Sequence, residues 1–169
     1  MYEIDGVPTA GTAQADAGPL LGDRYEQARQ AHAACMVCGA DTAGRPVFGL
    51  RFAADRAGGV EATFRTARQY QGYDGILHGG VIATLLDAAM VHCLFAHGVT
   101  AVTAEMTVRF LREVPIDCDV RLGATLNGER HGVFQLTASL SRAGTRLCVA
   151  RGKFCRSVGR QAPGPTDMR

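Results

Sequence analysis

Residues 81–96 are the part of the chain that most restricts its fold, because they form an almost wholly apolar run in which Asp87 is the only acid. The run follows His78-Gly79-Gly80, which we interpret as the start of a helix. A helix that is apolar on every side is normally enclosed by other structure. It falls short of the ~20 apolar residues needed to cross a bilayer and carries Asp87 and His92. We therefore expect a core helix and no membrane span.

The glycine pair and the acid indicate a function for this helix. The first turn of a helix leaves backbone N–H groups unpaired, and these can bind a developing negative charge. An ionised side chain is seldom placed among apolar residues without a partner, because its desolvation costs several kcal/mol. We expect Asp87 to be functional; the structural alternative is an acid that caps a neighbouring loop or pairs with an arginine.

The residues after the helix change to a period of two. Along residues 101–111, Thr103, Glu105, Thr107 and Arg109 are predicted to lie on one face, and the opposite face takes Val102, Ala104, Met106, Val108 and Phe110. Such alternation is typical of a half-buried strand. Further strands are expected at residues 120–126, 133–140 and 146–154, with turns at 127–130 and 141–144, and a hairpin from residues 47–54 and 60–66 precedes the helix.

One long helix must bury its surface against this sheet, and a curved sheet wrapped around the helix does so. We predict an α+β fold with one central helix and an antiparallel sheet of about six strands. Residues 1–30 are expected to be a loosely ordered leader with the start of a short helix at 25–34, residues 31–156 one domain, and residues 157–169 a flexible tail.

Composition excludes several classes of protein. The net charge of +2 is too small to indicate a nucleic-acid-binding protein. Residues 1–23 contain no basic run followed by an apolar core, so no export signal is predicted, and the six cysteines show no repeated spacing typical of a disulfide framework. We expect a cytoplasmic protein.

The motif around the helix resembles that of hotdog-fold proteins, specifically the acyl-CoA thioesterases of the phenylacetate-pathway (PaaI-like) type. The resemblance spans roughly residues 35–156 and is tightest over Tyr73-Asp-Gly-Ile-Leu-His-Gly-Gly-Val-Ile-Ala-Thr-Leu-Leu-Asp87-Ala-Ala-Met90. Residues 103–115 are also similar to that family's strand after the helix. The resemblance implies a hotdog fold, hydrolysis of an acyl-CoA substrate, no cofactor besides the coenzyme A of the substrate, and self-association.

The resemblance also implies roles for individual residues. The Gly79 N–H would bind the thioester carbonyl oxygen, Asp87 would be the nucleophile or general base, and His78 would support the turn. Thr103 would hold the attacking water, although the alternation places it on the face away from the core. A bulge, or exposure to a neighbouring subunit, would reconcile the two. Substrate contacts are predicted for Gly80 and Tyr73 near the same helix start.

Thioester chemistry agrees with these residues. Attack on an acyl carbon needs a donor for the oxyanion and a group that delivers or becomes the nucleophile. A thiolate, with the cysteine reference pKa of ~8.5 as a guide, leaves without prior protonation, so one carboxylate suffices. An acyl-aspartate anhydride and base-assisted attack by water both require ionised Asp87, and the sequence does not separate them.

The spacing along the helix predicts an assembly. Gly79 and Asp87 are eight residues apart, hence ~12 Å along one helix axis, too far to flank one carbonyl group. We therefore expect a homodimer in which Gly79 of one helix faces Asp87 of the other, with two equivalent sites. Dimers of this fold often pair again into tetramers.

Coenzyme A carries phosphates, so arginines and lysines on the strands are candidates for its binding. The candidates are Arg109, Arg112, Arg151, Lys153 and Arg156, with ordinary solvation of an outward sheet face as the alternative.

His32-x-x-Cys35-x-x-Cys38-Gly could begin a zinc site or a redox pair, but no second cysteine pair follows. This phrase resembles an N-terminal element of many of these thioesterases, where it has no catalytic role, and we predict no metal. The other four cysteines are expected to be small core residues.

Two other functions are alternatives for a domain of this fold. A hotdog domain that binds acyl-CoA or another apolar ligand without turnover would have no need of a buried acid. A hotdog hydratase or dehydratase would use a histidine paired with an acid in phrases that are absent from this sequence. No nucleophile-elbow phrase surrounds Ser139 or Ser141, which argues against a serine hydrolase. His92, His97 and His131 are expected to form hydrogen bonds at helix ends or turns.

Overall fold

The computed structural model describes residues 23–30, 32–39, 48–55 and 57–156. The predicted tail and most of the predicted leader lie outside these residues. In chain order the elements are α1 (Asp23–Gln30), β1 (Ala53–Ala54), β2 (Val60–Arg65), a 3-10 turn η1 (Arg68–Tyr70), α2 (Gly79–Ala96), β3 (Ala101–Phe110), β4 (Asp119–Arg130), β5 (Val133–Arg142) and β6 (Thr145–Arg156).

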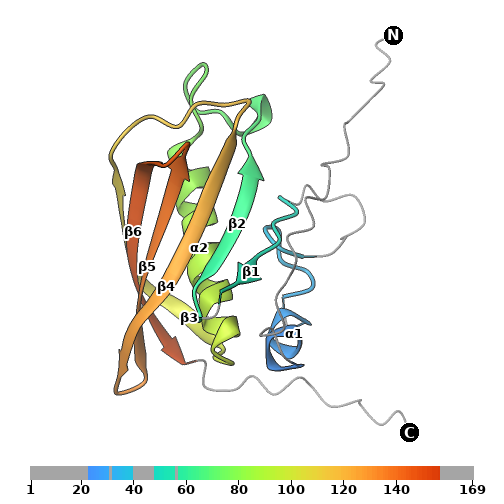
Figure 1. Ribbon diagram of the computed structural model, residues 1–169, viewed down its shortest axis with the longest axis vertical. Helices are drawn as coiled ribbons and strands as arrows, with labels where there is room; N and C mark the ends of the chain where they lie inside the picture. The colour runs from blue at the N-terminus through green and yellow to red at the C-terminus, as the bar shows by residue number, and fades with distance from the viewer. Residues whose placement is uncertain (1–22, 31, 40–47, 56, 157–169) are drawn as a thin grey trace, which may run out of the picture.

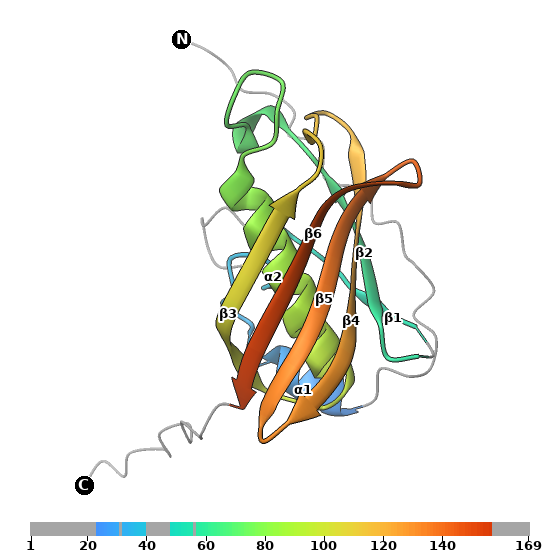
Figure 2. The same cartoon turned by 90° about the vertical axis from the view of Figure 1, so that its left-hand side faces the viewer.

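The described strands form one antiparallel sheet in the order β1-β2-β4-β5-β6-β3. The sheet curls along the length of α2, and α1 packs near the C-terminal end of that helix (Figures 1 and 2). Strand β2 buries every second side chain, as expected for a strand with one face on a core. The predicted α+β architecture, with one central helix and six strands, is confirmed.

Helix α2 supplies the centre of the hydrophobic core. Leu85, Leu86, Ala89 and Met90 have no exposed surface. By length and composition alone the helix could cross a membrane. The sheet packs along it instead, which identifies it as the core helix of this fold.

The hairpin predicted before α2 is much shorter than expected. Of the described residues 48–54, only Ala53 and Ala54 pair with β2. The backbone ahead of them bonds elsewhere: the Phe48 N–H donates to the Met36 carbonyl and the Leu50 N–H to the Val37 carbonyl. The predicted strand is wrong over residues 48–52, because the turn at residues 32–39 supplies the hydrogen bonds that a second strand would have given.

The first of the two predicted turns between the later strands differs from the prediction, whereas the second lies within the predicted residues 141–144. Strand β4 continues through residues 127–130, where a turn was expected, and its register shifts between Leu126 and Gly128. The chain reverses at His131 and Gly132, both with positive φ, and the next hairpin reverses at Ala143 and Gly144 in the same way. Two successive positive φ angles match the right-handed twist of the strands that they join.

Strand β3 at the edge of the sheet departs from simple alternation. Thr103 pairs with Phe154 and Glu105 with Lys153, so Ala104 is an extra residue without a partner. Phe154 is fully buried on the helix side of the sheet, which places Thr103 on that side and leaves Val102 57% exposed. The predicted faces of Val102, Thr103 and Ala104 are therefore wrong, because one extra residue in a strand reverses the direction of the side chains beyond it.

Candidate active site

The site begins at the N-terminus of α2. His78 is the residue before the first helical turn, and its Nδ1 accepts a hydrogen bond from the Gly80 N–H at 2.9 Å. A Cβ at Gly80 would lie 3.0 Å from the His78 ring, so glycine suits this close approach. No acceptor for the Gly79 N–H is found among the described residues. The helix start thus presents an unpaired donor beside an exposed histidine.

Two helical turns further along, Asp87 meets the edge strand. The Thr103 hydroxyl donates to Asp87 Oδ1 at 2.7 Å, and the two residues are sixteen positions apart. The bulge at Ala104 makes this contact possible, because it turns Thr103 toward the helix. Of the two explanations considered for Thr103, the structure shows the bulge.

Asp87 is not enclosed within the single chain. It is partly exposed, and so are Thr84 and Val91 on the same side of α2, in line with exposed Gly80. The spacing of 4, 3 and 4 residues defines one stripe along the helix, which we call the open face. The prediction of an acid surrounded by apolar structure is wrong for one protomer, because the sheet and α1 leave this side of the helix uncovered.

Gly79 and Asp87 remain apart within the chain. They are the first and ninth residues of α2, so the helical rise separates them by ~12 Å along the axis. Phe110 is the side chain beside Gly79: a Cβ built there would meet its ring at 3.5 Å. A single protomer thus presents a donor and a carboxylate in line, too far apart to act on one carbonyl group.

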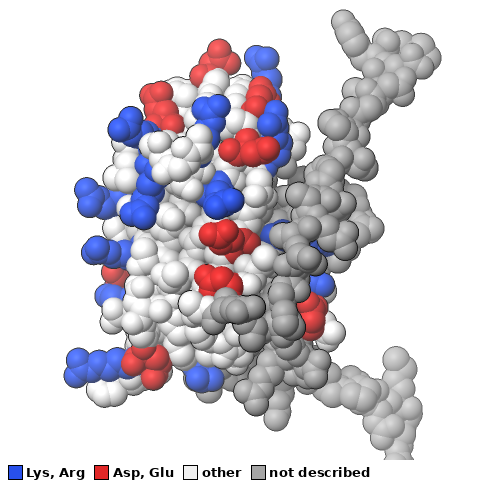
Figure 3. Space-filling view, in the orientation of Figure 1, with Lys and Arg blue, Asp and Glu red and all other residues white. Residues whose placement is uncertain are grey.

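The predicted substrate-contacting residues are dispersed. Arg151 and Lys153 alternate with buried residues of β6 and so point away from α2, and Lys153 Nζ lies 2.7 Å from Glu105 Oε2. Arg109 is exposed on β3, and Tyr73 is 83% exposed in the loop before α2. On the face seen in Figure 3, cationic and acidic side chains are interspersed.

Arg112, one of the predicted cationic residues, lines a pocket. This pocket of about 550 Å³ lies at the end of the molecule near the α2 N-terminus, and Arg142, Gly75 and Leu147 also line it. Arg142 was not predicted as a site residue, because it lies at the end of β5 outside any motif.

The sequence also missed a polar pair on the covered side of α2. The Tyr25 hydroxyl lies 2.7 Å from Nδ1 of His92, which is 2% exposed. Burial raises the pKa of Tyr25 to about 12, so the hydroxyl keeps its proton and donates to His92. Burial, with smaller contributions from the charges of His32, Arg29 and Arg51, lowers the pKa of His92 to about 3. The expectation that His92 bonds at a helix end is wrong: it is a neutral core residue.

The segment after α1 lies near the same helix. The His32 ring packs edge-on against Phe95 of α2, with 5.0 Å between ring centres. Burial lowers the pKa of His32, and the negative charge of Asp87 acts in the opposite direction. Cys35 and Cys38 are close to His32, and these three side chains could together hold a metal ion.

This chain is similar to one protein family and to several solved structures. Residues 74–148 match the family model described as the thioesterase superfamily. A solved thioesterase superfamily protein is 24% identical, with a TM-score of 0.64 over 66% of this chain and 55% of that protein. This chain therefore spans little more than half the length of that relative. No curated protein matches the chain.

Two further solved structures cover most of their own chains. The PaaI protein of the E. coli phenylacetic acid degradation operon is 19% identical, with a TM-score of 0.67 over 79% of this chain and 95% of that one. A hypothetical thioesterase protein from Streptococcus pneumoniae, solved with coenzyme A, is 18% identical, with a TM-score of 0.60 over 64% of this chain and 88% of that one.

The streptococcal protein was also solved with alanine replacing an aspartate and with alanine replacing a threonine sixteen positions later. The structural matches share the central helix and antiparallel sheet, so the hotdog fold predicted from the sequence is confirmed. The match over residues 74–148, which contain the helix and the start of the site, makes this part of the chain similar to the thioesterase superfamily, and the PaaI protein shares its fold.

Proposed function

We propose that this protein is an acyl-CoA thioesterase, which hydrolyses an acyl-CoA to a free acid and coenzyme A. The thioesterase superfamily match supports hydrolysis of a thioester. The streptococcal relative solved with coenzyme A supports an acyl-CoA substrate. No cofactor is required beyond the coenzyme A that the substrate carries.

One observation carries the proposal: the Thr103 hydroxyl holds Asp87 at 2.7 Å on the open face of α2, the helix whose first residue has an unpaired N–H. The hydroxyl occupies Oδ1 and orients the carboxylate, which leaves Oδ2 for the reaction. The separation of sixteen residues between Asp87 and Thr103 equals that between the aspartate and the threonine replaced in the streptococcal protein. This equality further supports a shared role.

The chemistry follows from these groups. Asp87 either removes a proton from a water molecule that attacks the acyl carbon, or attacks that carbon itself to give an anhydride that water then hydrolyses. In both routes the carbonyl oxygen gains negative charge, and the Gly79 N–H at the positive end of the helix stabilises it. The C–S bond then breaks and coenzyme A leaves as a thiolate, which needs no general acid at neutral pH.

The proposed site is completed by a second copy of the chain. The open face of α2 brings exposed Gly80 and partly exposed Asp87 to the surface. The neighbouring edge strand β3 exposes Val102 and Phe110 by more than half, and an unpaired, apolar edge is suited to association. A twofold axis across this face would bring Gly79 of one protomer to Asp87 of its partner. Two such dimers could form a tetramer by pairing again.

The nucleotide end of coenzyme A would lie near the α2 N-terminus. Arg112 and Arg142 line the pocket there, and guanidinium groups bind phosphates in a bidentate manner. Gly80 and Tyr73 would contact the remainder of the substrate from the same end. Arg109, Arg151 and Lys153 point away from this region in the same chain, so they would contact the substrate only from a neighbouring protomer.

Replacement of Asp87 by asparagine tests the proposal. The variant keeps the size and the contact with Thr103 but cannot act as a base or nucleophile. We expect kcat for thiol release from a panel of short, long and aromatic acyl-CoA substrates to fall by at least ~10². Asp119→Asn is the matched control, because Asp119 is exposed on β4 and pairs only with Arg65 across the strands.

Two results would contradict the proposal. Undiminished thiol release by Asp87→Asn would remove Asp87 from the mechanism. Binding of acyl-CoA by the native protein without turnover of any substrate in the panel would identify a non-catalytic binding domain instead.

A further inference from the structure

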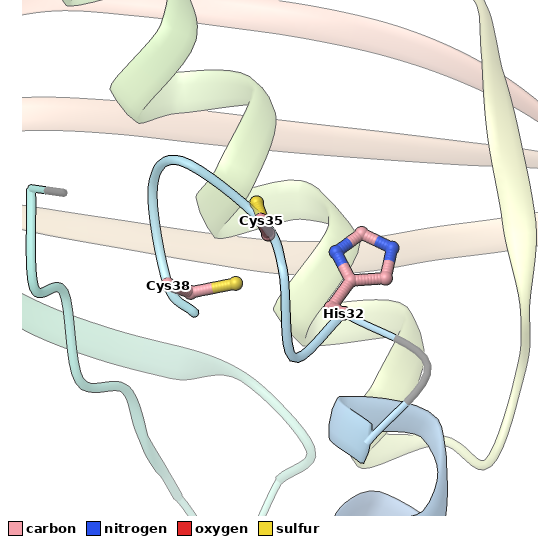
Figure 4. Close-up of side chains that lie close together, drawn as sticks. All are labelled: His32, Cys35 and Cys38. Carbon is pink, nitrogen blue, oxygen red and sulfur yellow. The ribbon is translucent and has the colours of Figure 1, made fainter. Parts of the chain in front are cut away.

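Three potential metal ligands meet in the turn that follows α1. One ligand atom each from His32, Cys35 and Cys38 lies within 4.8 Å of the other two. Figure 4 shows the three side chains on one loop beside α2, with the imidazole facing the region of the two sulfurs. The spacing of two residues between successive ligands is that of one half of many zinc sites.

The backbone of this turn holds the ligands in place. The Cys35 N–H donates to the His32 carbonyl at 2.9 Å, and the Gly39 N–H donates to the Cys35 carbonyl at 2.8 Å. A Cβ at Gly39 would lie 2.5 Å from the carbonyl oxygens of Ala33 and Cys35, so only glycine permits this tight fold. The Val37 N–H also points at the Cys35 sulfur, at 3.4 Å. A hydrogen bond of this kind orients a thiolate ligand and stabilises its charge.

The packing around the three side chains fixes their positions and leaves the cluster open to solvent on one side. The His32 ring packs edge-on against Phe95, with 5.0 Å between ring centres, and this packing fixes the imidazole beside the two cysteines. Cys38 is 3% exposed, whereas His32 and Cys35 are partly exposed. The cluster is therefore anchored on its inner side and reachable by solvent on its outer side.

We infer that His32, Cys35 and Cys38 bind one zinc ion, through one imidazole nitrogen and two thiolate sulfurs. Binding releases the two thiol protons to solvent, and the two thiolates cancel the charge of Zn²⁺. The neutral complex is thus compatible with Arg51, which donates to the Cys38 carbonyl at 3.2 Å. Zn–S and Zn–N bonds of about 2.3 and 2.0 Å require the ligand atoms to approach by roughly 1 Å, and water takes the fourth tetrahedral position.

A redox disulfide is the competing use of two cysteines at this spacing. A redox pair uses only the two sulfurs. Here His32 also places a ring nitrogen within 4.8 Å of both sulfurs, and a disulfide would give that nitrogen no role. A metal ion explains all three side chains, because its charge offsets the cost of the buried thiolate.

The three ligands are separate from the proposed catalytic residues. They lie on the turn after α1, whereas Asp87 lies on the open face of α2 and Thr103 on the edge strand β3. Bound zinc would stabilise the turn at residues 32–39, to which the backbone N–H groups of Phe48 and Leu50 donate hydrogen bonds. Metal binding and thioester hydrolysis can therefore fail separately.

Metal titration of the full-length protein tests the inference. The reduced, metal-free protein competes with a chromogenic chelator for Zn²⁺, and Co²⁺ serves as a spectroscopic probe. We expect one ion per chain, with the absorption bands of tetrahedral cobalt and of thiolate-to-cobalt charge transfer. Cys38→Ser and His32→Asn should each weaken binding by at least about 100-fold, since even the loss of a group that only hydrogen-bonds to a metal ligand costs ~10–100-fold.

Cys155→Ser is the matched control, because Cys155 is a partly exposed cysteine on β6 outside the cluster. It should bind zinc as the native protein does. The inference is overturned if the native protein binds no stoichiometric zinc, if Cys38→Ser binds it with native affinity, or if Cys35 and Cys38 form a disulfide on purification that reduction does not convert to a zinc-binding form. Acyl-CoA hydrolysis measured on the same samples tests the proposed function separately.

Discussion

Helix α2 carries two polar side chains that are five residues apart and meet different surroundings. Asp87 accepts a hydrogen bond of 2.7 Å from Thr103 on the open face, and His92 forms one of 2.7 Å with Tyr25 on the covered side. His92 is 2% exposed, whereas Asp87 is partly exposed. The two hydrogen bonds have the same length, but only the Asp87 bond is accessible to solvent.

We infer from this difference that His92 serves stability and that Asp87 serves the proposed reaction. The neutral His92–Tyr25 pair joins α1 to the core, and burial fixes the protonation of both groups. The Asp87–Thr103 pair remains accessible to a substrate or to a second protomer. We therefore expect changes on the open face to alter kcat with little effect on stability, and changes on the covered side to do the reverse.

Removal of the oxyanion donor should have the largest effect. Gly79→Pro deletes the N–H, and proline is tolerated in the first turn of a helix. His78 already has the extended conformation, φ −61° and ψ 133°, that a residue before proline requires. We expect kcat to fall by ~10²–10³. Gly79→Ala keeps the N–H and adds a Cβ in ordinary contact with Phe110, so the ratio of the two variants measures the donor.

Mixed dimers extend this test to the assembly. A protomer with Asp87→Asn retains Gly79, and one with Gly79→Pro retains Asp87. If sites form between chains, half of randomly mixed dimers contain one intact site, which restores about a quarter of native activity. Activity that stays at the level of the separate variants would show that each chain works alone.

The covered side should respond to pH. The pKa of His92 is about 3 in the folded chain, against an ordinary value of 6.5. Below pH 6.5 the unfolded chain gains a proton that the folded chain does not, so stability present at neutral pH is lost as the pH falls toward 3. The loss is about 1.4 kcal/mol per pH unit, or roughly 100-fold in the unfolding equilibrium over two units.

Urea unfolding of the native protein and of His92→Gln at several pH values checks this expectation. The two proteins share every other titrating group, so the difference between their profiles isolates His92. Parallel profiles between pH 6 and 4 would show that His92 is protonated in the folded chain as well.

Loss of the Tyr25 hydroxyl should have a smaller effect on stability. Tyr25→Phe leaves His92 Nδ1 without a donor in the core, where an unpaired polar group costs about 1–3 kcal/mol. Nε2 of the same ring already has no partner among the described residues. We expect a lower urea midpoint with an unchanged slope, and kcat within twofold of native. A large fall in kcat at native stability would contradict this expectation, because it would show that the covered side of α2 contributes to catalysis.

Loss of the Thr103 hydroxyl should have the smallest effect of these changes. Unlike loss of the Tyr25 hydroxyl, it should lower kcat and leave stability nearly unchanged. Thr103→Val keeps the shape but removes the bond to Asp87, and we expect kcat to fall about tenfold. Stability should change by no more than about 0.5 kcal/mol, because Thr103 is exposed on an edge strand. Thr107→Val, at another exposed position of β3, should leave both quantities unchanged.

The sequence predicted the fold well because its signals are local and repeated. An apolar run before a series of alternating segments indicates a core helix and a sheet, and both are present. The failures occur where tertiary contacts override local pattern. Residues 48–52 read as a strand, but Phe48 and Leu50 bond to the turn at residues 32–39, which no periodicity reveals.

The sequence offers candidate residues for the site, but it indicates their geometry only in part. His78, Gly79 and Asp87 stand in one short motif, and the structure places them along one helix. Whether Asp87 is enclosed depends on which side of α2 the sheet covers, and a nearly uniform apolar helix gives no indication of that side. The Tyr25–His92 pair joins residues 67 positions apart, and such long-range contacts leave no signal in one sequence.

The hydrogen bond between Thr103 and Asp87 depends on the extra residue at Ala104, because that residue sets which face of β3 carries the Thr103 side chain. Deleting one residue there would carry Thr103 to the outer surface without altering a single side chain of the pair. A mutational survey limited to substitutions would miss this control point, whereas a scan of single-residue deletions along β3 would locate it.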